Sequence, residues 1–269
     1  MLQYVARPPT PALANTVEYV WASSGAPAHP YERVVPTGTL ELIISLVDDK
    51  RRIHGAGGDG SFSGAGVAGA YRRPFTFDTH EDASVLGVHF RPGRAAAVLG
   101  VPPGELMDRH VDLEALWGRR ARELRERLRE APTTPERFAI LEAELVARLD
   151  ANRVHPAVTY ALDVLTRPEA RVADVAKQVS LSQRRLIELF TACVGITPKR
   201  FGRVMRFRRA TELAQTTSFD WTRVAYECGY YDQAHLIRDC HELAAMTPRE
   251  LARASVHVKE HHQLAVLGP

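Results

Sequence analysis

Two segments in the C-terminal half of the chain, about fifty residues apart, repeat one helical pattern. Each has a short amphipathic stretch containing a small residue, Ala176 or Ala225, and then a turn. A second amphipathic stretch follows, beginning at a polar residue, Ser182 or Asp232, and it runs into a Thr-Pro pair. A helix, a short turn and a second helix with a polar N-cap make a helix-turn-helix unit. The repeat therefore predicts two such units.

Apolar residues at helical spacing indicate which side of each unit faces the core. These are Val172, Val175, Ala176 and Val179 in the first unit, and Val224, Ala225 and Cys228 in the second. On the second helices, Leu186, Leu189 and Phe190 are expected to correspond to Leu236, Ile237 and Cys240. Thr197 is expected to cap a long helix that joins the two units, with Pro198 at its first position.

Positive charge is concentrated in one segment of the chain. Residues 182–209 contain eight Lys and Arg and a single acid, Glu188, for a charge of +7. The whole chain carries +3, so the remainder is slightly acidic. A basic segment on such a protein favours a polyanionic partner.

Double-stranded DNA is the predicted partner, because the second helix of such a unit presents its first turn to the major groove. Gln183 and Arg184 are the base-edge candidates, since glutamine suits adenine and arginine suits guanine. Glu188 either accepts from a cytosine amine or pairs with a neighbouring arginine. The full set of candidates is Gln183, Arg184, Arg185 and Glu188 in the first unit, Gln233, His235 and Arg238 in the second, and Arg203, Arg206 and Arg209 on the joining helix. The joining arginines either contact phosphate or pair with nearby acids.

The N-terminal part has a different pattern. Apolar runs at 40–47 and 83–93, bounded by turn residues, predict antiparallel strands. The expected fold is α+β. A β-sandwich or cupin-like barrel spans residues 1–110, a helical linker or dimerisation region 111–153, the helix-turn-helix domain 154–254 and a flexible tail 255–269. The Arg/Glu alternation at 119–130 is interpreted as a solvated helix face.

A metal site is the alternative interpretation of residues 227–242, which contain Cys228, His235, Cys240 and His241. Their spacing matches no tetrahedral zinc pattern. Free cysteine behaves as a small apolar residue, so Cys228 and Cys240 are expected in the core. No metal or cofactor is predicted.

The N-terminal part shows no catalytic constellation, so no enzymatic activity is predicted. Its histidines are scattered, and the glycine-rich stretch at 55–69 lacks the end of a phosphate-binding loop. Candidates for a ligand pocket are Trp21, Arg33, Glu41, His89 and Arg91, although the sequence does not select them over core or surface roles. The remaining alternative is a β-barrel metal sensor or enzyme with a helical accessory domain.

Compartment signals favour the cytoplasm. Three cysteines make no secreted disulfide framework. The N-terminus has no basic stretch followed by an apolar core, and no apolar run is long enough to span a membrane.

The motifs of the C-terminal part resemble those of a known family. "VADVAKQVSLSQRRLIELFTACVGITPKRFGRVMRFRRATELAQ" and "WTRVAYECGYYDQAHLIRDCHELAAMTPREL" look like the DNA-binding domain of AraC/XylS transcriptional regulators, over about residues 155–253. Ser180 stands where that family often has glycine, and Cys240 where it usually has phenylalanine. "ERVVPTGTLELIISL" and "VLGVHFRPGRAAAVLGVPPGELMDRHVDLEALWG" are similar to a subgroup with an uncharacterised β-rich sensor-like domain.

This resemblance implies a bacterial, cytoplasmic regulator that binds DNA in a sequence-specific manner. It also implies that a small-molecule effector or a second copy of the chain acts at the N-terminal domain. RNA polymerase is a further candidate partner. The resemblance leaves open the effector, the operator and the choice between activation and repression.

Overall fold

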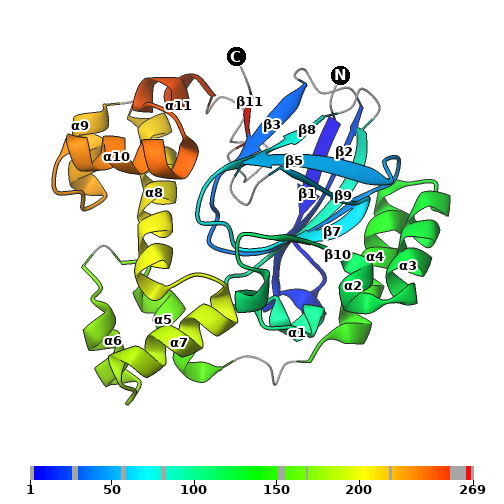
Figure 1. Cartoon of the computed structure of the whole chain (residues 1–269), viewed down its shortest axis with the longest axis horizontal. Coiled ribbons are helices and arrows are strands. Elements are labelled where there is room, and N and C mark those ends of the chain that lie inside the picture. Colours follow the sequence, from blue (N-terminus) through cyan, green and yellow to red (C-terminus); the bar gives the residue numbers. More distant parts are fainter. Residues whose placement is uncertain are drawn as a thin grey trace.

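The chain forms a strand-rich N-terminal domain and a helical C-terminal domain, which lie side by side in the computed structural model (Figure 1). The structure describes residues 3–25, 30–55, 59–79, 83–150, 155–167, 169–217, 220–254 and 265–267. Strands predominate up to residue 112 and helices follow, so the predicted α+β class is confirmed.

Two antiparallel sheets make up the N-terminal domain, as predicted for a sandwich. The six-stranded sheet has the order β1 (Gln3–Arg7), β2 (Val17–Gly25), β9 (Ala83–Phe90), β4 (Glu41–Ser45), β7 (Ala65–Ala68) and β10 (His110–Asp112). The five-stranded sheet has the order β11 (Ala265–Leu267), β3 (Tyr31–Val34), β8 (Phe75–Asp78), β5 (Lys50–Gly55) and β6 (Gly60–Ser63). The apolar runs at 40–47 and 83–93 supply β4 and β9, which pair with each other in the middle of the larger sheet.

The two faces of the six-stranded sheet pack against different partners. Leu42, Ile44 and Val88 are at most 1% exposed and belong to one apolar core with the helices that follow the sheet. Successive side chains of a strand point to opposite faces, and Ile43 accordingly packs on the other side. There it joins a small separate core between the sheets, formed by Val34, Ala68, Tyr71 and Phe75.

The segment between the β-rich part and the helix-turn-helix domain folds back onto the larger sheet. It contains α1 (Ala96–Leu99), η2 (Pro103–Leu106), α2 (Leu113–Trp117), α3 (Arg119–Glu130) and α4 (Thr134–Arg148), and η1 (Pro11–Leu13) packs on α4. Leu113 of α2 and Leu141 and Leu145 of α4 are 0% exposed. These apolar side chains of the predicted linker or dimerisation region are therefore buried within the chain.

The Arg/Glu alternation of α3 is only partly the solvated face that was predicted. Arg119 does make an exposed i,i+4 pair with Glu123, at 3.0 Å. Arg125, in contrast, donates from Nε to the Ser45 carbonyl at 2.8 Å, and Arg129 donates from Nε to the Leu46 carbonyl at 2.8 Å. Both side chains thus hold the turn after β4, because its carbonyls need donors that the sheet does not supply.

The C-terminal domain consists of seven helices within the described residues. They are α5 (Pro156–Val164), α6 (Val172–Gln178), α7 (Gln183–Val194), α8 (Pro198–Thr216), α9 (Trp221–Glu227), α10 (Gln233–Ala244) and α11 (Pro248–Ala254). The predicted caps of α7, α8 and α10 are confirmed. The side chains of Ser182, Thr197 and Asp232 each accept a hydrogen bond from a backbone N–H in the first turn of the helix that follows.

The two turns use the same backbone cap with different residues. In the first turn, the Ser180 N–H donates to the Lys177 carbonyl and the Leu181 N–H to the Ala176 carbonyl. In the second turn, the N–H groups of Gly229 and Tyr230 make the equivalent bonds. This cap needs a left-handed residue, and the φ angles are 55° at Ser180 and 72° at Gly229. The first unit therefore carries a backbone conformation that a residue with a Cβ atom rarely adopts.

The segment expected to form a flexible tail, 255–269, lies outside the described residues except for 265–267. Those three residues form β11, which pairs antiparallel with β3. An edge strand presents unpaired backbone groups that a further strand can bond. In Figure 1 β11 lies beside β3, near α11.

The left-handed turn of the first unit gives a stability prediction. We expect Ser180→Gly to raise the free energy of unfolding by roughly 0.5–1 kcal/mol, because glycine adopts this conformation without the Cβ penalty. Ser180→Ala, which keeps the penalty, is the control. Urea denaturation measures both, and a glycine variant no more stable than the alanine variant contradicts the prediction.

Candidate functional site

The first turn of α7 presents polar side chains to solvent. Gln183, Arg184, Arg185 and Glu188 are all exposed, as their predicted role requires. Arg184 donates to Glu188 across one helical turn at 2.9 Å, and Arg185 lies 3.7 Å from the same carboxylate. The carboxylate of Glu188 is therefore engaged by two neighbouring arginines, which was one of its two predicted roles.

The first turn of α10 is less open than that of α7. Gln233 is exposed, as is Arg238 in the following turn, whereas His235 is half-buried, with its ring nearly perpendicular to that of Tyr230 at a centroid distance of 5.1 Å. Two exposed tyrosines flank this turn: Tyr226 on α9 and Tyr231 before the cap are 87% and 93% exposed. Cys228 and Cys240 are 0% exposed, as predicted.

The arginines of α8 have different environments. Arg203 donates from Nε to Asp239 at 2.6 Å and also bonds Glu242, and Arg206 stacks over the ring of Tyr230 at 4.8 Å. Arg209 is exposed. Of the three arginines predicted to contact phosphate, Arg203 thus makes the alternative contact with acids, and Arg209 has the most open side chain.

The partner of Arg203 shows how the two units differ. When the second helices of the two units are aligned from their caps, Asp239 is the residue that corresponds to Leu189. The sequence had led us to expect Ile237 at this position. Asp239 is 0% exposed. The Arg203 guanidinium, followed by that of Arg200, holds the pKa of Glu242 down at about 2. The second unit is therefore attached to α8 by ion pairs.

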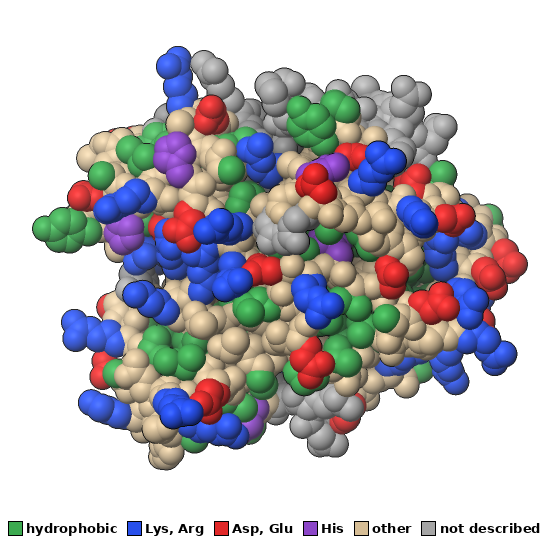
Figure 2. All heavy atoms as spheres, viewed as in Figure 1, with side chains coloured by type: hydrophobic (Ala, Val, Ile, Leu, Met, Phe, Trp, Pro, Cys, Tyr) green, Lys and Arg blue, Asp and Glu red, His purple; other side chains and the backbone are tan. Residues whose placement is uncertain are grey.

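The two units lie at opposite ends of α8 (Figure 1). That helix has 19 residues, and a rise of about 1.5 Å per residue makes it roughly 28 Å long. One turn of B-DNA is about 34 Å. Figure 2 shows Lys and Arg side chains gathered over the part of the surface that Figure 1 assigns to α8 and its neighbours.

The C-terminal ends of α7 and α10 contact the N-terminal domain. A Cβ atom at Gly195, which caps α7, would lie 2.9 Å from Ala70 and 3.2 Å from the Pro103 carbonyl, so the backbones are in close contact. Arg33 of β3 donates to the Ala244 and Ala245 carbonyls at 3.5 Å each. Arg200 of α8 also donates to the Arg72 carbonyl.

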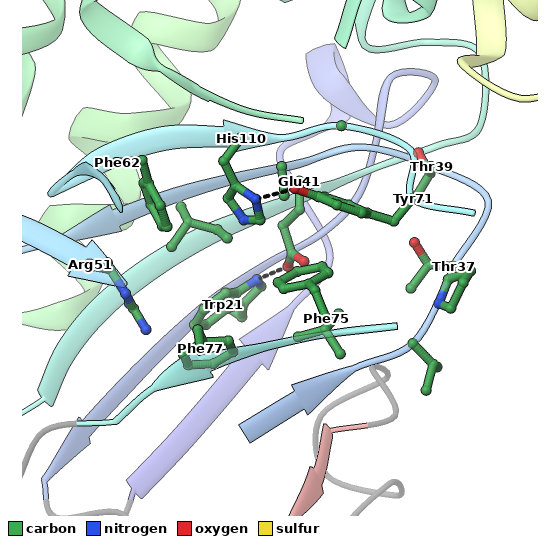
Figure 3. A pocket seen from close by; sticks show the side chains of 16 residues that line it. Trp21, Thr37, Thr39, Glu41, Arg51, Phe62, Tyr71, Phe75, Phe77 and His110 are labelled. Carbon is green, nitrogen blue, oxygen red and sulfur yellow. Dashed lines mark hydrogen bonds between the residues drawn. The ribbon is translucent and has the colours of Figure 1, made fainter. Parts of the chain in front are cut away.

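A cavity of about 60 Å³, partly open to solvent, lies between the two sheets (Figure 3). Its aromatic lining is Trp21, Phe62, Tyr71, Phe75 and Phe77, and its ionisable groups besides Tyr71 are Glu41, Arg51 and His110. Figure 3 shows Arg51 and Phe62 at one end and Thr37 and Thr39 at the other. Apolar walls with a few polar groups are typical of a small-molecule site.

Two of the ionisable groups in the cavity are driven towards their neutral forms. Burial raises the pKa of Glu41 to about 8, although the Trp21 Nε1–H donates to its carboxyl at 2.6 Å. Burial, with the charge of Arg51, lowers the pKa of His110 to about 3. Tyr71 Oη lies 2.5 Å from Nδ1 of His110. Near pH 7 the guanidinium of Arg51 is therefore the principal charge of the cavity.

The sequence-based pocket candidates are only partly brought together. Trp21 and Glu41 line the cavity, but Arg33 bonds the end of α10, and His89 stacks on Tyr19. Arg91 donates to the Ala14 carbonyl. The sequence reasoning missed the aromatic residues of β6 and β8 and the charge on β5. Strand alternation in "KRRIHG" was the available signal, since it separates the inward Arg51 from the exposed Arg52.

Family models match both domains. Residues 175–254 match the model described as "Helix-turn-helix domain", and residues 6–112 match a "Domain of unknown function". None of the curated proteins compared with the chain matches it. Within the helices that the structure describes, none is both long and apolar enough to cross a lipid bilayer.

Solved structures are similar to the chain in part or over most of its length. A transcriptional regulator from Chromobacterium violaceum, described as containing an AraC-type DNA-binding domain, is 27% identical; the match covers 38% of this chain and 94% of that one, with a TM-score of 0.35. ToxT from Vibrio cholerae is 10% identical over 94% of this chain and 98% of its own, with a TM-score of 0.47. Wild-type ToxT bound to an unsaturated fatty acid is 9% identical over 93% and 94%, with a TM-score of 0.47.

The raised pKa of Glu41 gives a pH prediction. A carboxyl that binds its proton more tightly in the folded than in the unfolded state makes the free energy of unfolding fall as pH rises from about 4.5 to about 8. Glu41→Gln, which still accepts from Trp21, should lose this part of the pH dependence. Chemical denaturation at pH 5 and pH 8 measures it, with Glu126→Gln on the exposed face of α3 as control. Equal pH dependence in the wild type and Glu41→Gln contradicts the prediction.

Proposed function

We propose that this chain, a protein of the AraC type with a helix-turn-helix DNA-binding domain at residues 175–254, is a sequence-specific transcription regulator whose N-terminal domain responds to a small molecule. Double-stranded DNA is its macromolecular partner. A regulator of this kind would act in the cytoplasm. RNA polymerase and a second copy of the chain are compatible partners, and a dimer would not use Leu113, Leu141 or Leu145, which are buried within the chain.

The observation that carries the DNA-binding proposal is the pair of capped, exposed helix starts at the two ends of α8. Each helix N-terminus has unpaired backbone N–H groups and a positive dipole end, which favour phosphate. The first two turns of each helix also expose an amide and a guanidinium, which suit base edges: Gln183 and Arg184 on α7, and Gln233 and Arg238 on α10. The length of α8 suits helices that enter successive major grooves.

The remaining candidates take supporting roles in this proposal. Arg185 is exposed beside Arg184, and Arg209 is exposed on α8; both are proposed to contact phosphate. Arg203 and Arg206 are proposed to position α10, through Asp239 and Tyr230 respectively. His235 packs on Tyr230 and is proposed to orient the first turn of α10, while Glu188 orients Arg184.

The small-molecule response is supported by one segment that lines the cavity and also contacts α8. Residues 34–37 and Thr39 line the cavity. Arg208 of α8 donates to the Thr37 carbonyl at 3.4 Å, and a Cβ atom at Gly38 would lie 2.8 Å from Met205. A ligand that moves this segment therefore moves a surface packed on the helix that joins the two units.

Base reading by α7 is tested by Arg184→Ala. We expect it to weaken binding to a duplex selected from random sequences by about 1–3 kcal/mol, and to relax preference at one base pair. Fluorescence anisotropy on the selected and a scrambled duplex measures this. Arg120→Ala, on the exposed surface of α3, is the control. An equal loss on both duplexes would show that Arg184 contacts only phosphate.

The different roles of two α8 arginines give a second DNA-binding prediction. Arg209→Ala should weaken binding to the selected and the scrambled duplex by the same factor. It should also reduce the magnitude of the slope of log K against log salt by about one unit, because one phosphate contact is lost. Arg203→Ala should instead lower the free energy of unfolding, since it leaves Asp239 buried without its partner. The prediction is wrong if Arg203→Ala changes the salt slope and leaves stability unaltered.

A further inference from the structure

The strongest unexplained group in the molecule is the guanidinium of Arg51. Arg51 is 8% exposed and lines the cavity from β5. Its Nε atom is buried and has no hydrogen-bond partner among the described residues, and its guanidinium lies over the ring of Phe77 at 4.8 Å. A buried charge without a paired anion is costly. Such a group suggests that the missing partner is a bound anion.

Nearby carboxylates do not fill this role in the part of the chain that the structure describes. Asp48 and Glu32 are close enough to favour the charged form of Arg51 electrostatically, but neither forms an ion pair with it within 4.0 Å. Burial raises the pKa of Glu32, which weakens it as a counter-ion. Glu41 is in the cavity and accepts from Trp21, and its proton is retained near neutral pH.

The charge balance of the cavity selects the class of anion. With Glu41 and His110 neutral, the guanidinium contributes one positive charge, which matches a monoanion better than a phosphate dianion. Arginine binds a carboxylate through two parallel hydrogen bonds. An ammonium ligand is disfavoured, because it would meet the charge of Arg51 and a neutral Glu41.

The walls of the cavity select the rest of the ligand. Phe62, Phe75, Phe77 and Trp21 offer ring faces and edges around the space next to Arg51 (Figure 3). Flat apolar groups stack on such rings with favourable geometry. A body extending from Arg51 past these rings points towards Thr37 and Thr39, the end of the cavity next to the segment that contacts α8.

We propose that the cavity binds a small carboxylic acid with an aromatic or flat apolar body, held by an ion pair between its carboxylate and Arg51. This inference rests on the proposed function, since it names the class of effector for the N-terminal domain. It also makes Arg51 a residue kept for binding at a cost to the stability of the unliganded protein.

The first test needs no ligand. Arg51→Met keeps the length and packing of the side chain but removes the unpaired charge, so the unliganded variant should be at least as stable as the wild type. Arg52→Met, on the exposed face of the same strand, is the matched control. Urea denaturation of the full chain measures both. A clear loss of stability confined to Arg51→Met would mean that the guanidinium has a structural partner, and would overturn the proposal.

The second test uses three carboxylates of increasing size: benzoate, 3-phenylpropionate and 2-naphthoate. We expect at least one to bind in calorimetry, and about tenfold or more weaker binding for its neutral amide and for Arg51→Met, because the charged hydrogen bonds are lost. Arg52→Met should bind as the wild type does. Absence of binding by all three, or binding unaffected by Arg51→Met, would overturn the proposal.

A separate measurement distinguishes this inference from the proposed function. The affinity for the selected duplex is measured by anisotropy with and without the carboxylate that binds. If a carboxylate binds through Arg51 but leaves the DNA affinity unchanged, the proposed ligand class is supported and the proposed response of DNA binding to a small molecule is contradicted. DNA binding by a protein that takes none of the carboxylates contradicts the ligand class alone.

Discussion

The ion pair between Arg203 and Asp239 is the contact on which the arrangement of the helical domain depends. Asp239 has no exposed surface, so its carboxylate requires a charged partner, and breaking such a pair costs about 3–5 kcal/mol. In the first unit the same position is Leu189, a partly buried apolar residue. The second unit is consequently held on α8 by a directional contact, which fixes its orientation as well as its position.

The helix α8 also connects the two domains. Its arginines bond α10, the Arg72 carbonyl and the Thr37 carbonyl, while Phe201 and Met205 lie against Gly38. Much of the positive charge that first indicated DNA therefore has a structural use in this conformation. Exposed charge that remains for DNA includes Arg184 and Arg185 in the first turn of α7, Arg238 in the second turn of α10, and Arg209. The proposed ligand cavity borders the same junction, so one segment can sense the ligand and adjust the helix.

Local features were predictable where their causes lie within a few residues. Ser182, Thr197 and Asp232 cap helices because a side-chain oxygen can reach a backbone N–H three residues later, and nothing distant interferes. The strands at 41–45 and 83–90 follow from apolar runs between turn residues. Helical periodicity directs Cys228 and Cys240 inwards, and both are buried. The hydrogen bonds of Arg125 and Arg129 were not predictable, because the carbonyls that accept them lie some eighty residues earlier in the chain.

Periodicity and capping act over a few residues, so the order of amino acids was enough to establish the two helix-turn-helix units, their caps and the polar side of each. Which arginines remain available, and which residues form the cavity, depends instead on packing between distant parts of the chain. Arg51, Phe77 and His110 come from three strands in two sheets, and their juxtaposition follows from how the sheets stack. A buried charge is recognised only when its surroundings are known, since its cost arises from the loss of water and of a partner across the fold.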